Sequence, residues 1–190
     1  MRAAPVGVLY PSSSLDELIR GAYECAIPTH GGQMAVCAAA AVAAAVSAAL
    51  DGRSGAEVLT IAVRAAKAAE SRRPDGEAWI AAIHEVYSDP AKRKRLTVDE
   101  VTDEYFPSKP RTIVPLAIGL ALVTESAQQT ALLAASIGGD ADSLASIGSA
   151  IAGALHPETV NEKWYEAVDL INGSELIDTV TSLAALRHNR

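Results

Sequence analysis

Apolar residues recur at helical spacing along most of the chain, and this pattern predicts a series of helices rather than a sheet. The strongest signal lies in residues 33–50, where Met34, Val42 and Val46 fall on one face and alanine fills most of the other positions. A helix that is apolar on nearly every side has no face suited to water. We therefore expect this helix to lie at the centre of the fold.

Polar capping residues, glycines and prolines place the ends of the other predicted helices. We expect these helices over residues 15–26, 54–71, 77–87, 113–124, 127–137, 140–155, 163–171 and 174–186. Residues 5–11 are expected to form an irregular or short helical entry, and residues 88–111 a polar connection with one or two helical turns at 97–105. No stretch alternates as a strand does, and no tandem repeat of fixed period is found. The prediction is an all-α protein, a compact bundle of helices.

Composition is ordinary for a globular chain, but the charge excludes one class of function. A chain of 190 residues with 49% hydrophobic residues is one domain by length and can bury a real core. The formal net charge is −7, whereas proteins that bind nucleic acid rely on clustered Lys and Arg. The basic run Lys92–Arg95 is short and isolated, and we interpret it as a solvated helix end. We therefore predict no nucleic-acid partner.

Cysteines and uncharged stretches bear on the compartment. Cys25 and Cys37 lie in apolar helical segments, where free buried thiols are common, and two cysteines are not a disulfide framework. Pro5 and Gly7 interrupt the apolar N-terminal run, which makes it a poor signal peptide. Residues 34–50 are uncharged but marginal in length and hydrophobicity for a membrane span. We expect a cytoplasmic protein without a membrane segment.

Candidate chemistry is concentrated in one short sequence, GGDADS, at residues 138–143. Two glycines allow backbone conformations that other residues resist, and they let a ligand approach the main chain closely. The carboxylates of Asp140 and Asp142 and the hydroxyl of Ser143 are all oxygen ligands, which suit Mg²⁺, Mn²⁺ or Ca²⁺ rather than Zn²⁺. They lie where a helix is predicted to begin, so neighbouring side chains can converge on one point. The sequence thus suggests a divalent-cation site.

A second explanation of the same residues stays open. Gly138 and Gly139 would also end one helix, with Asp140 as the N-cap of the next and Asp142 favourable in its first turn. A calcium-binding helix–loop–helix is excluded, because the glycine and glutamate that it requires do not follow. Residues 144–155 are small on nearly every face, which predicts close helix packing and a rigidly held N-terminus.

These residues resemble a known family. The sequence GGDADSLASIGSAIAGAL, residues 138–155, is similar to the C-terminal signature of the ADP-ribosylglycohydrolase family, Gly-Gly-Asp-x-Asp-Thr followed by a helix of small residues. Residues 1–10 resemble the family's internal Met-Arg-x-x-Pro-hydrophobic-Gly segment, and residues 29–31 its Thr-His loop before an alanine-rich helix. Residues 113–117 and the Pro and Trp within 157–164 resemble further segments in the expected order. The resemblance covers nearly the whole chain.

The resemblance implies an orthogonal bundle of helices that holds two Mg²⁺ or Mn²⁺ ions. These ions bind the ribose hydroxyls of ADP-ribose and help to cleave the bond at its anomeric carbon. Carried over to this chain, Asp140, Asp142 and Ser143 are the implied metal ligands, with Ser143 in place of the usual threonine. Asp140 and Asp142 are also the implied catalytic carboxylates. The expected function is divalent-metal-dependent hydrolysis of ADP-ribosyl or related N- or O-ribosyl bonds.

The resemblance also implies a substrate pocket. Thr29 and His30 would line the ribose or phosphate pocket, and Gly138 and Gly139 would let the substrate approach the main chain. The resemblance is what favours this role for His30, since a loop histidine is otherwise expected to bond to nearby backbone.

One part of the family pattern is missing from the sequence. The family's Gly-Asp-x-x-Gly and Thr-Asp-Asp-Thr segments, which supply further metal ligands, do not occur in it. We therefore expect residues 1–190 to be a single domain that corresponds to the C-terminal portion of the family fold, without the N-terminal helices. The expected partners are ADP-ribose or an ADP-ribosylated substrate, and a second copy or another chain that supplies the missing motifs. Two alternatives stay open: an inactive half-domain that binds ADP-ribose or a partner, and a helical interaction module whose acidic motif is only a cap.

Overall fold

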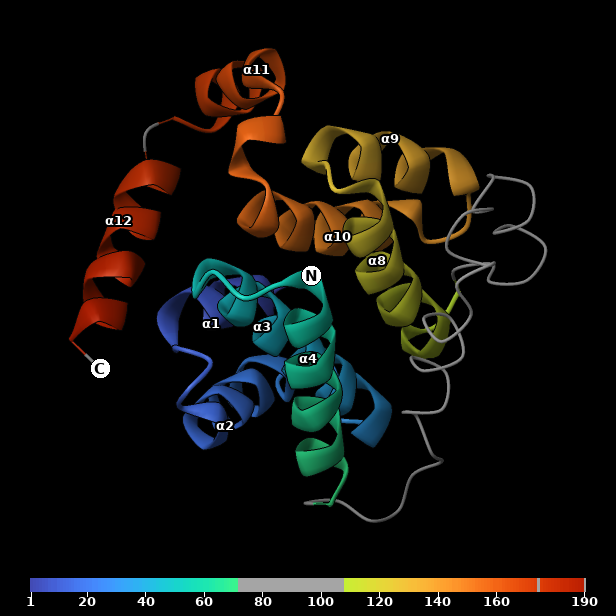
Figure 1. Ribbon diagram of the computed structural model, residues 1–190, viewed down its shortest axis with the longest axis vertical. Helices are drawn as coiled ribbons and strands as arrows, with labels where there is room; N and C mark the ends of the chain where they lie inside the picture. Colours follow the sequence, from blue (N-terminus) through green and yellow to red (C-terminus); the bar gives the residue numbers. More distant parts are fainter. Residues whose placement is uncertain (72–107, 174, 190) are drawn as a thin grey trace.

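The computed structural model describes residues 1–71, 108–173 and 175–189, and every regular element in these ranges is helical (Figure 1). The helices are α1 (Ala4–Leu9), α2 (Leu15–Ala26), α3 (Gln33–Leu50), α4 (Gly55–Ser71), α8 (Pro110–Thr124), α9 (Ala127–Ile137), α10 (Ala141–Leu155), the 3₁₀ helix η1 (Pro157–Thr159), α11 (Glu162–Asn172) and α12 (Glu175–His188). The predicted all-α class is confirmed for this part of the chain. The helix predicted at 77–87, the turns at 97–105 and the basic run Lys92–Arg95 lie outside the described residues.

One predicted helix start was wrong. Helix α8 begins at Pro110 rather than at residue 113. Pro110 suits the first helical position, and the hydroxyl of Thr112 accepts a hydrogen bond from the main-chain N–H of Lys109 at 3.4 Å. Pro115, expected in the first turn, therefore lies buried inside the helix.

Helix α3 is the centre of the molecule, as its uniform apolar pattern predicted. It packs against α1, α2, α4, α8 and α10, and its alanines from Ala40 to Ala45 are almost wholly buried. By length and composition alone α3 would be able to cross a membrane, but 72% of it is buried within the fold, which is the environment of a core helix.

Two glycines let helix pairs approach closely on either side of this centre. A Cβ atom on Gly7 of α1 would lie 2.4 Å from the carbonyl oxygen of Ala43 in α3. A Cβ atom on Gly148 of α10 would lie 2.8 Å from Cγ2 of Thr130 in α9. The close packing predicted for the small-residue helix after Ser143 is thus confirmed at Gly148.

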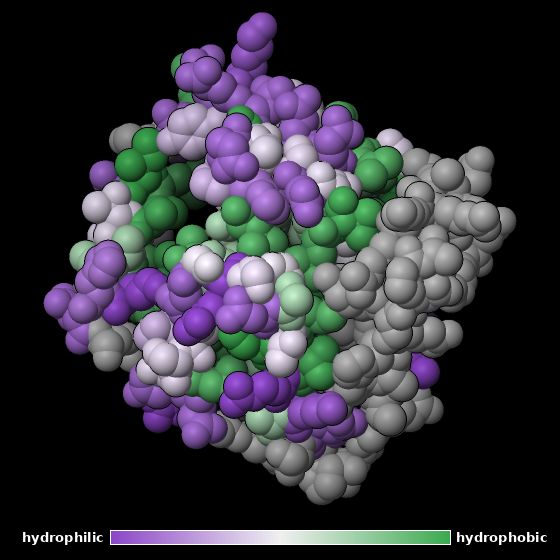
Figure 2. Space-filling model, in the orientation of Figure 1, coloured by the Kyte–Doolittle hydropathy of each residue, from purple (hydrophilic) through white to green (hydrophobic). Residues whose placement is uncertain are grey.

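Helices α11 and α12 lie at the edge of the molecule and bury none of their described residues (Figure 1). Most of their large apolar side chains are about half exposed or more, and Leu170 and Ile171 are 86% and 81% exposed. Figure 2 shows apolar surface gathered on this side of the molecule, beside α12. Helix α12 lies against α1 and reaches α3 through its penultimate residue, Arg187.

Candidate functional site

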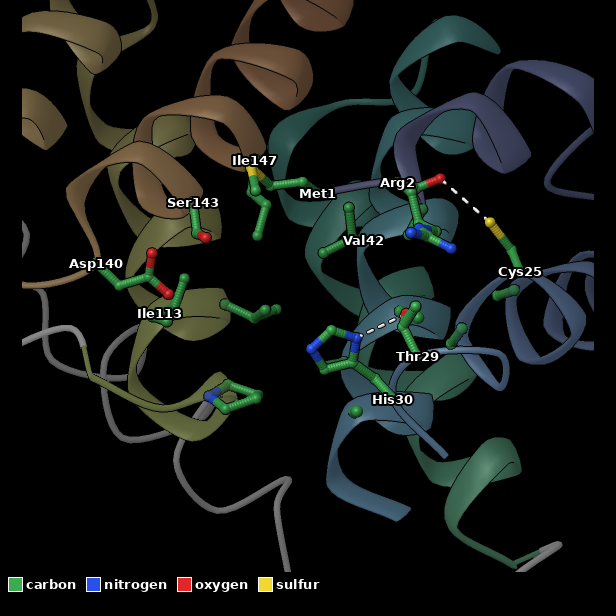
Figure 3. Close-up of a pocket in the computed structure, with 18 of the residues that line it drawn as sticks. Met1, Arg2, Cys25, Thr29, His30, Val42, Ile113, Asp140, Ser143 and Ile147 are labelled. Carbon is green, nitrogen blue, oxygen red and sulfur yellow. Dashed lines mark hydrogen bonds between the residues drawn. The ribbon is translucent and has the colours of Figure 1, made fainter. Parts of the chain in front are cut away.

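A cavity of about 400 Å³ has the N-terminal residues before α1 and helices α2 and α3 on one side, and α8 and α10 on the other (Figure 3). Its lining includes Thr29, His30, Asp140 and Ser143, which come from distant parts of the sequence. Two elements therefore bring together four of the residues expected to form the site: the loop before α3 and the start of α10.

Small side chains make room for this cavity. The wall formed by α3 carries Ala35, Ala38 and Ala39, and the wall formed by α2 carries Ala22 and Ala26. Each ends at Cβ, so the two helices leave open space between their backbones and those of α8 and α10. The alanine-rich pattern that places α3 in the core also keeps the pocket open, because alanine side chains are too short to fill it. A concave, mostly apolar space with a few polar groups is typical of a small-molecule site.

The acidic wall of the cavity is formed at the start of α10. Gly138 and Gly139 have φ angles of 86° and 63°, which glycine adopts without strain, and they connect α9 to α10. Asp140 occupies the N-cap position, but its side chain makes no capping hydrogen bond. The explanation of Asp140 as a helix cap therefore lacks its defining interaction. Its carboxylate and the Ser143 hydroxyl face the cavity, both half-buried (Figure 3).

Three of the expected site residues lie beside the cavity rather than in its lining. Gly138 and Gly139 are exposed and form the turn that presents Asp140. Asp142 is exposed too, and it is not among the lining residues. The neighbouring Asp140 carboxyl group, and then the main-chain N–H of Ser143, hold the pKa of Asp142 below its ordinary value. Asp142 is therefore ionised at neutral pH.

The opposite wall is polar and can carry positive charge. His30 Nδ1 and Thr29 Oγ1 are 2.9 Å apart and hydrogen-bonded, so the imidazole bonds to the neighbouring side chain rather than to backbone. Arg2 lies beside them, and its carbonyl accepts a hydrogen bond from Cys25 Sγ at 3.5 Å (Figure 3). Sequence reasoning did not propose Arg2 as a site residue. Its signal was present, because Arg2 belongs to the Met-Arg segment that carries part of the family resemblance.

The donor atoms on the acidic wall suit a divalent cation, but they are few. Carboxylate and hydroxyl oxygens are the ligands that Mg²⁺ and Mn²⁺ favour, and Mg²⁺ is commonly held by one or two carboxylates with waters in its other positions. Asp140, Asp142 and Ser143 fit that chemistry. Within residues 1–71, 108–173 and 175–189, however, no group of three or more His, Cys, Asp or Glu side chains is placed to hold a metal ion.

Comparison with known proteins identifies a family and a relative. A model of the ADP-ribosylglycohydrolase family matches residues 1–190, the whole chain. The chain is also 30% identical over 197 residues to the uncharacterized protein YegU of Escherichia coli strain K12. That match covers 100% of this chain and 59% of YegU, so the chain spans about three-fifths of the length of the curated relative that it matches.

Proposed function

The chain belongs to the ADP-ribosylglycohydrolase family, and from this premise we propose that its cavity binds the ADP-ribosyl group of a substrate and that a ribosyl bond is hydrolysed there with a divalent metal ion. One observation carries the proposal: Thr29, His30, Asp140 and Ser143 line the same cavity. The family as a whole is generally dependent on divalent metal ions.

The two walls of the cavity differ in charge in the way that an ADP-ribosyl group requires. Arg2 and His30 lie on one wall and Asp140 and Ser143 on the other (Figure 3). The diphosphate of the ligand is anionic and suits the wall that carries the guanidinium and the imidazole. The ribose hydroxyls and a cation suit the wall that offers carboxylate and hydroxyl oxygens. We therefore propose that the ligand spans the cavity with its diphosphate toward Arg2 and its reacting ribose toward Asp140.

In this proposal Asp140, Asp142 and Ser143 hold the metal ion, which supplies positive charge beside the ribose. The chain's own groups do the remaining work. The Asp140 carboxylate lies at the cavity wall, where it orients a ribose hydroxyl or a water molecule by accepting a hydrogen bond. The rigid packing of α10 at Gly148 holds the loop that presents this carboxylate. Apolar walls limit the water that reaches the ribose.

Binding without hydrolysis is a second candidate, and one observation favours it. In the part of the chain that the structure describes, Asp140 and Ser143 are the acidic-loop residues that line the cavity, and no larger group of metal-binding side chains joins them. A site with few ligands is able to bind ADP-ribose while lacking the charge stabilisation that cleavage needs. The two candidates predict the same binding and different turnover.

Calorimetry and a release assay separate these outcomes. ADP-ribose is titrated into the purified chain with Mg²⁺ present, and release of labelled ADP-ribose from a labelled ADP-ribosylated protein is followed in parallel. Asp140→Asn and Ser143→Ala are the test variants, and Glu166→Gln on exposed α11 is the matched control. Metal-dependent release that is lost only in the test variants supports hydrolysis. Saturable binding without release supports the binding candidate, and absence of both contradicts the proposal.

A further inference from the structure

Arg187, in the last turn of α12, reaches the main chain at the C-terminal end of α1. Its Nη1 atom donates hydrogen bonds to the carbonyl oxygens of Gly7 at 2.9 Å, Val8 at 3.2 Å and Tyr10 at 2.7 Å. The carbonyls at a helix C-terminus have no partner within the helix and form its negative end. One guanidinium nitrogen thus caps the short helix α1.

The other terminal nitrogen of Arg187 binds the C-terminal end of α3. Nη2 donates to the Ser47 carbonyl at 3.2 Å and pairs with Asp51 Oδ1 at 2.5 Å. Ser47 Oγ in turn donates to the Tyr10 carbonyl at 2.6 Å, and Asp51 Oδ2 accepts from the N–H and hydroxyl of Ser12 at 2.8 and 2.6 Å. The guanidinium therefore joins the last turns of two helices through one planar group, in a geometry that Lys cannot reproduce.

These hydrogen bonds from Arg187 to the C-terminal ends of α1 and α3, with its ion pair to Asp51, are called the Arg187 clasp below. The clasp is well shielded from solvent, although the helix that carries Arg187 is not. The Arg187 side chain is 13% exposed and that of Asp51 is 25% exposed, while no described residue of α12 is buried. Hydrogen bonds between charged groups gain strength when water is excluded from them. Polar contacts of one side chain, more than apolar burial, thus hold the end of α12 against the body of the molecule.

The two helices that Arg187 joins also position parts of the cavity wall, away from the ends that Arg187 binds. Arg2 and Ala3 line the cavity immediately before α1, and Ala38 and Val42 of α3 line it from the side. Between the two ends, Gly7 lies against Ala43 without room for a Cβ atom. That close contact makes a natural pivot, so the angle between α1 and α3 depends on what fixes the C-terminal end of α1.

We propose that Arg187 is a positioning residue for the cavity: by clasping the C-terminal ends of α1 and α3 it sets the placement of Arg2 opposite Asp140. The proposal rests on the proposed function insofar as the cavity binds ADP-ribose. Loss of the clasp frees α1 to pivot about Gly7, which moves the basic wall relative to the acidic one. Removing a coupling contact of this kind is expected to weaken ADP-ribose affinity about three- to thirtyfold.

The test compares Arg187→Met, which keeps the apolar stem, with Arg187→Lys, which keeps the charge but loses the planar fork. Arg64→Met, on the exposed face of α4, is the matched control. Calorimetry with ADP-ribose gives both the Kd and the number of competent sites per chain. A role in positioning raises Kd in both clasp variants at an unchanged number of sites. A role in stability alone lowers the number of sites and leaves Kd unchanged, which would overturn the proposal.

Hydrogen exchange tests the Arg187 clasp independently of ADP-ribose binding. We expect the amide hydrogens of residues 6–10 to exchange faster in Arg187→Met than in the wild type, while those of α9 and α10 keep their rates. If the wild type does not bind ADP-ribose, the proposed function fails. The exchange result alone then tests whether Arg187 fixes the C-terminal end of α1. Unchanged exchange at residues 6–10 overturns the proposal. Loss of folding in both clasp variants overturns it too, because Arg187 would then support the fold as a whole.

Discussion

His30 and Asp140 face one cavity from opposite walls, His30 from the loop before α3 and Asp140 from the N-cap position of α10 (Figure 3). This arrangement predicts that cation binding and ligand binding separate by mutation. Asp140→Ala is expected to weaken Mn²⁺ binding by about tenfold or more, because it removes an oxygen ligand. His30→Ala is expected to leave Mn²⁺ affinity unchanged and to weaken ADP-ribose binding about three- to tenfold, the worth of one hydrogen bond. Calorimetric titrations of each variant measure both constants.

Two results would contradict the assignment of Asp140 to the cation and of His30 to the ligand. Equal loss of Mn²⁺ binding in His30→Ala and Asp140→Ala would place both side chains on the cation. If Mn²⁺ binding survives Asp140→Ala, the acidic loop has no role in binding the metal ion. The alternative, that residues 138–143 only end one helix and cap the next, would then be favoured.

The contact between Gly7 and Ala43 gives a prediction about stability. Gly7→Ala places a Cβ atom 2.4 Å from a main-chain carbonyl oxygen, so α1 must move away from α3. We expect the free energy of unfolding to fall by about 1–3 kcal/mol, the usual cost of overpacking. Gly153→Ala in α10 is the matched control, because its nearest neighbour would lie at 3.8 Å. There the better helix propensity of alanine is expected to stabilise by up to about 1 kcal/mol.

Urea unfolding of the two variants measures both changes. The comparison is informative because both glycines lie inside helices and differ in the space around them. A Gly7→Ala protein as stable as the wild type would show that α1 is loosely placed, and the pivot inferred for Arg187 would lose its basis.

The sequence predicted the helices well and the clasp not at all, for physical reasons that particular residues show. The bounds of α2, α3 and α9 follow from local signals: serine caps, proline and glycine stops, and an apolar period. The grouping of Thr29 and His30 with Asp140 and Ser143 followed from a family signature, since spacing along the chain does not reveal which loops meet. Arg187 had no local signal, because most of its partners are carbonyl oxygens, which every residue carries, and Asp51 is 136 positions away in the sequence.

Acid should loosen the Arg187 clasp before the rest of the fold. Burial alone would raise the pKa of Asp51, but hydrogen bonds from the Ser12 hydroxyl and N–H and from Arg187 outweigh it and hold the pKa below the ordinary value of 3.8. A carboxyl group with a lowered folded pKa contributes stability above its unfolded pKa. That contribution is lost as the pH falls through the folded pKa.

The check is the difference in unfolding free energy between the wild type and Asp51→Asn as a function of pH. We expect a constant difference above about pH 5, and a decline as the pH falls through 3.8 and below. Asp169→Asn is the control, because it makes the same chemical change on α11, a helix that buries none of its residues. A difference for Asp51→Asn that is as large at pH 3 as at pH 7 would exclude the ionised carboxylate as the partner of Arg187.

The two cysteines are expected to differ in reactivity. Burial, with a further contribution from Glu70, raises the pKa of Cys37 to about 11. Only about one thiol in a thousand is then ionised at pH 8, and the thiolate is the reactive form. Cys25 is half-buried at the cavity. Alkylation at pH 8, read by peptide mass spectrometry, should modify Cys25 well before Cys37, and urea should abolish the difference. Rapid labelling of Cys37 in the folded Cys25→Ser protein would contradict the packing of α3.

The apolar surface of α11 and α12 predicts association. Contiguous apolar surface of this kind is uncommon on monomers and usually marks an interaction site. Leu170 and Ile171 are the most exposed large apolar side chains among the described residues, and Leu176, Ile177 and Val180 continue the surface along α12. We expect the purified chain to self-associate in light scattering coupled to size exclusion, or to bind a hydrophobic dye when monomeric. Replacing Leu170 and Ile171 together by serine should reduce both signals.

Leu132→Ser tests whether association depends on the α11 and α12 surface or on exposed apolar side chains in general. Leu132 is 44% exposed on α9, so it offers a similar apolar side chain on a different helix. If Leu132→Ser lowers the signals as much as the double serine variant does, association has no preferred face. If the wild type is a monomer that binds no dye, α11 and α12 must repack against the body in solution. Because Arg187 fixes only one end of α12, such repacking would leave the clasp intact and cover Leu170 and Ile171 from within the chain.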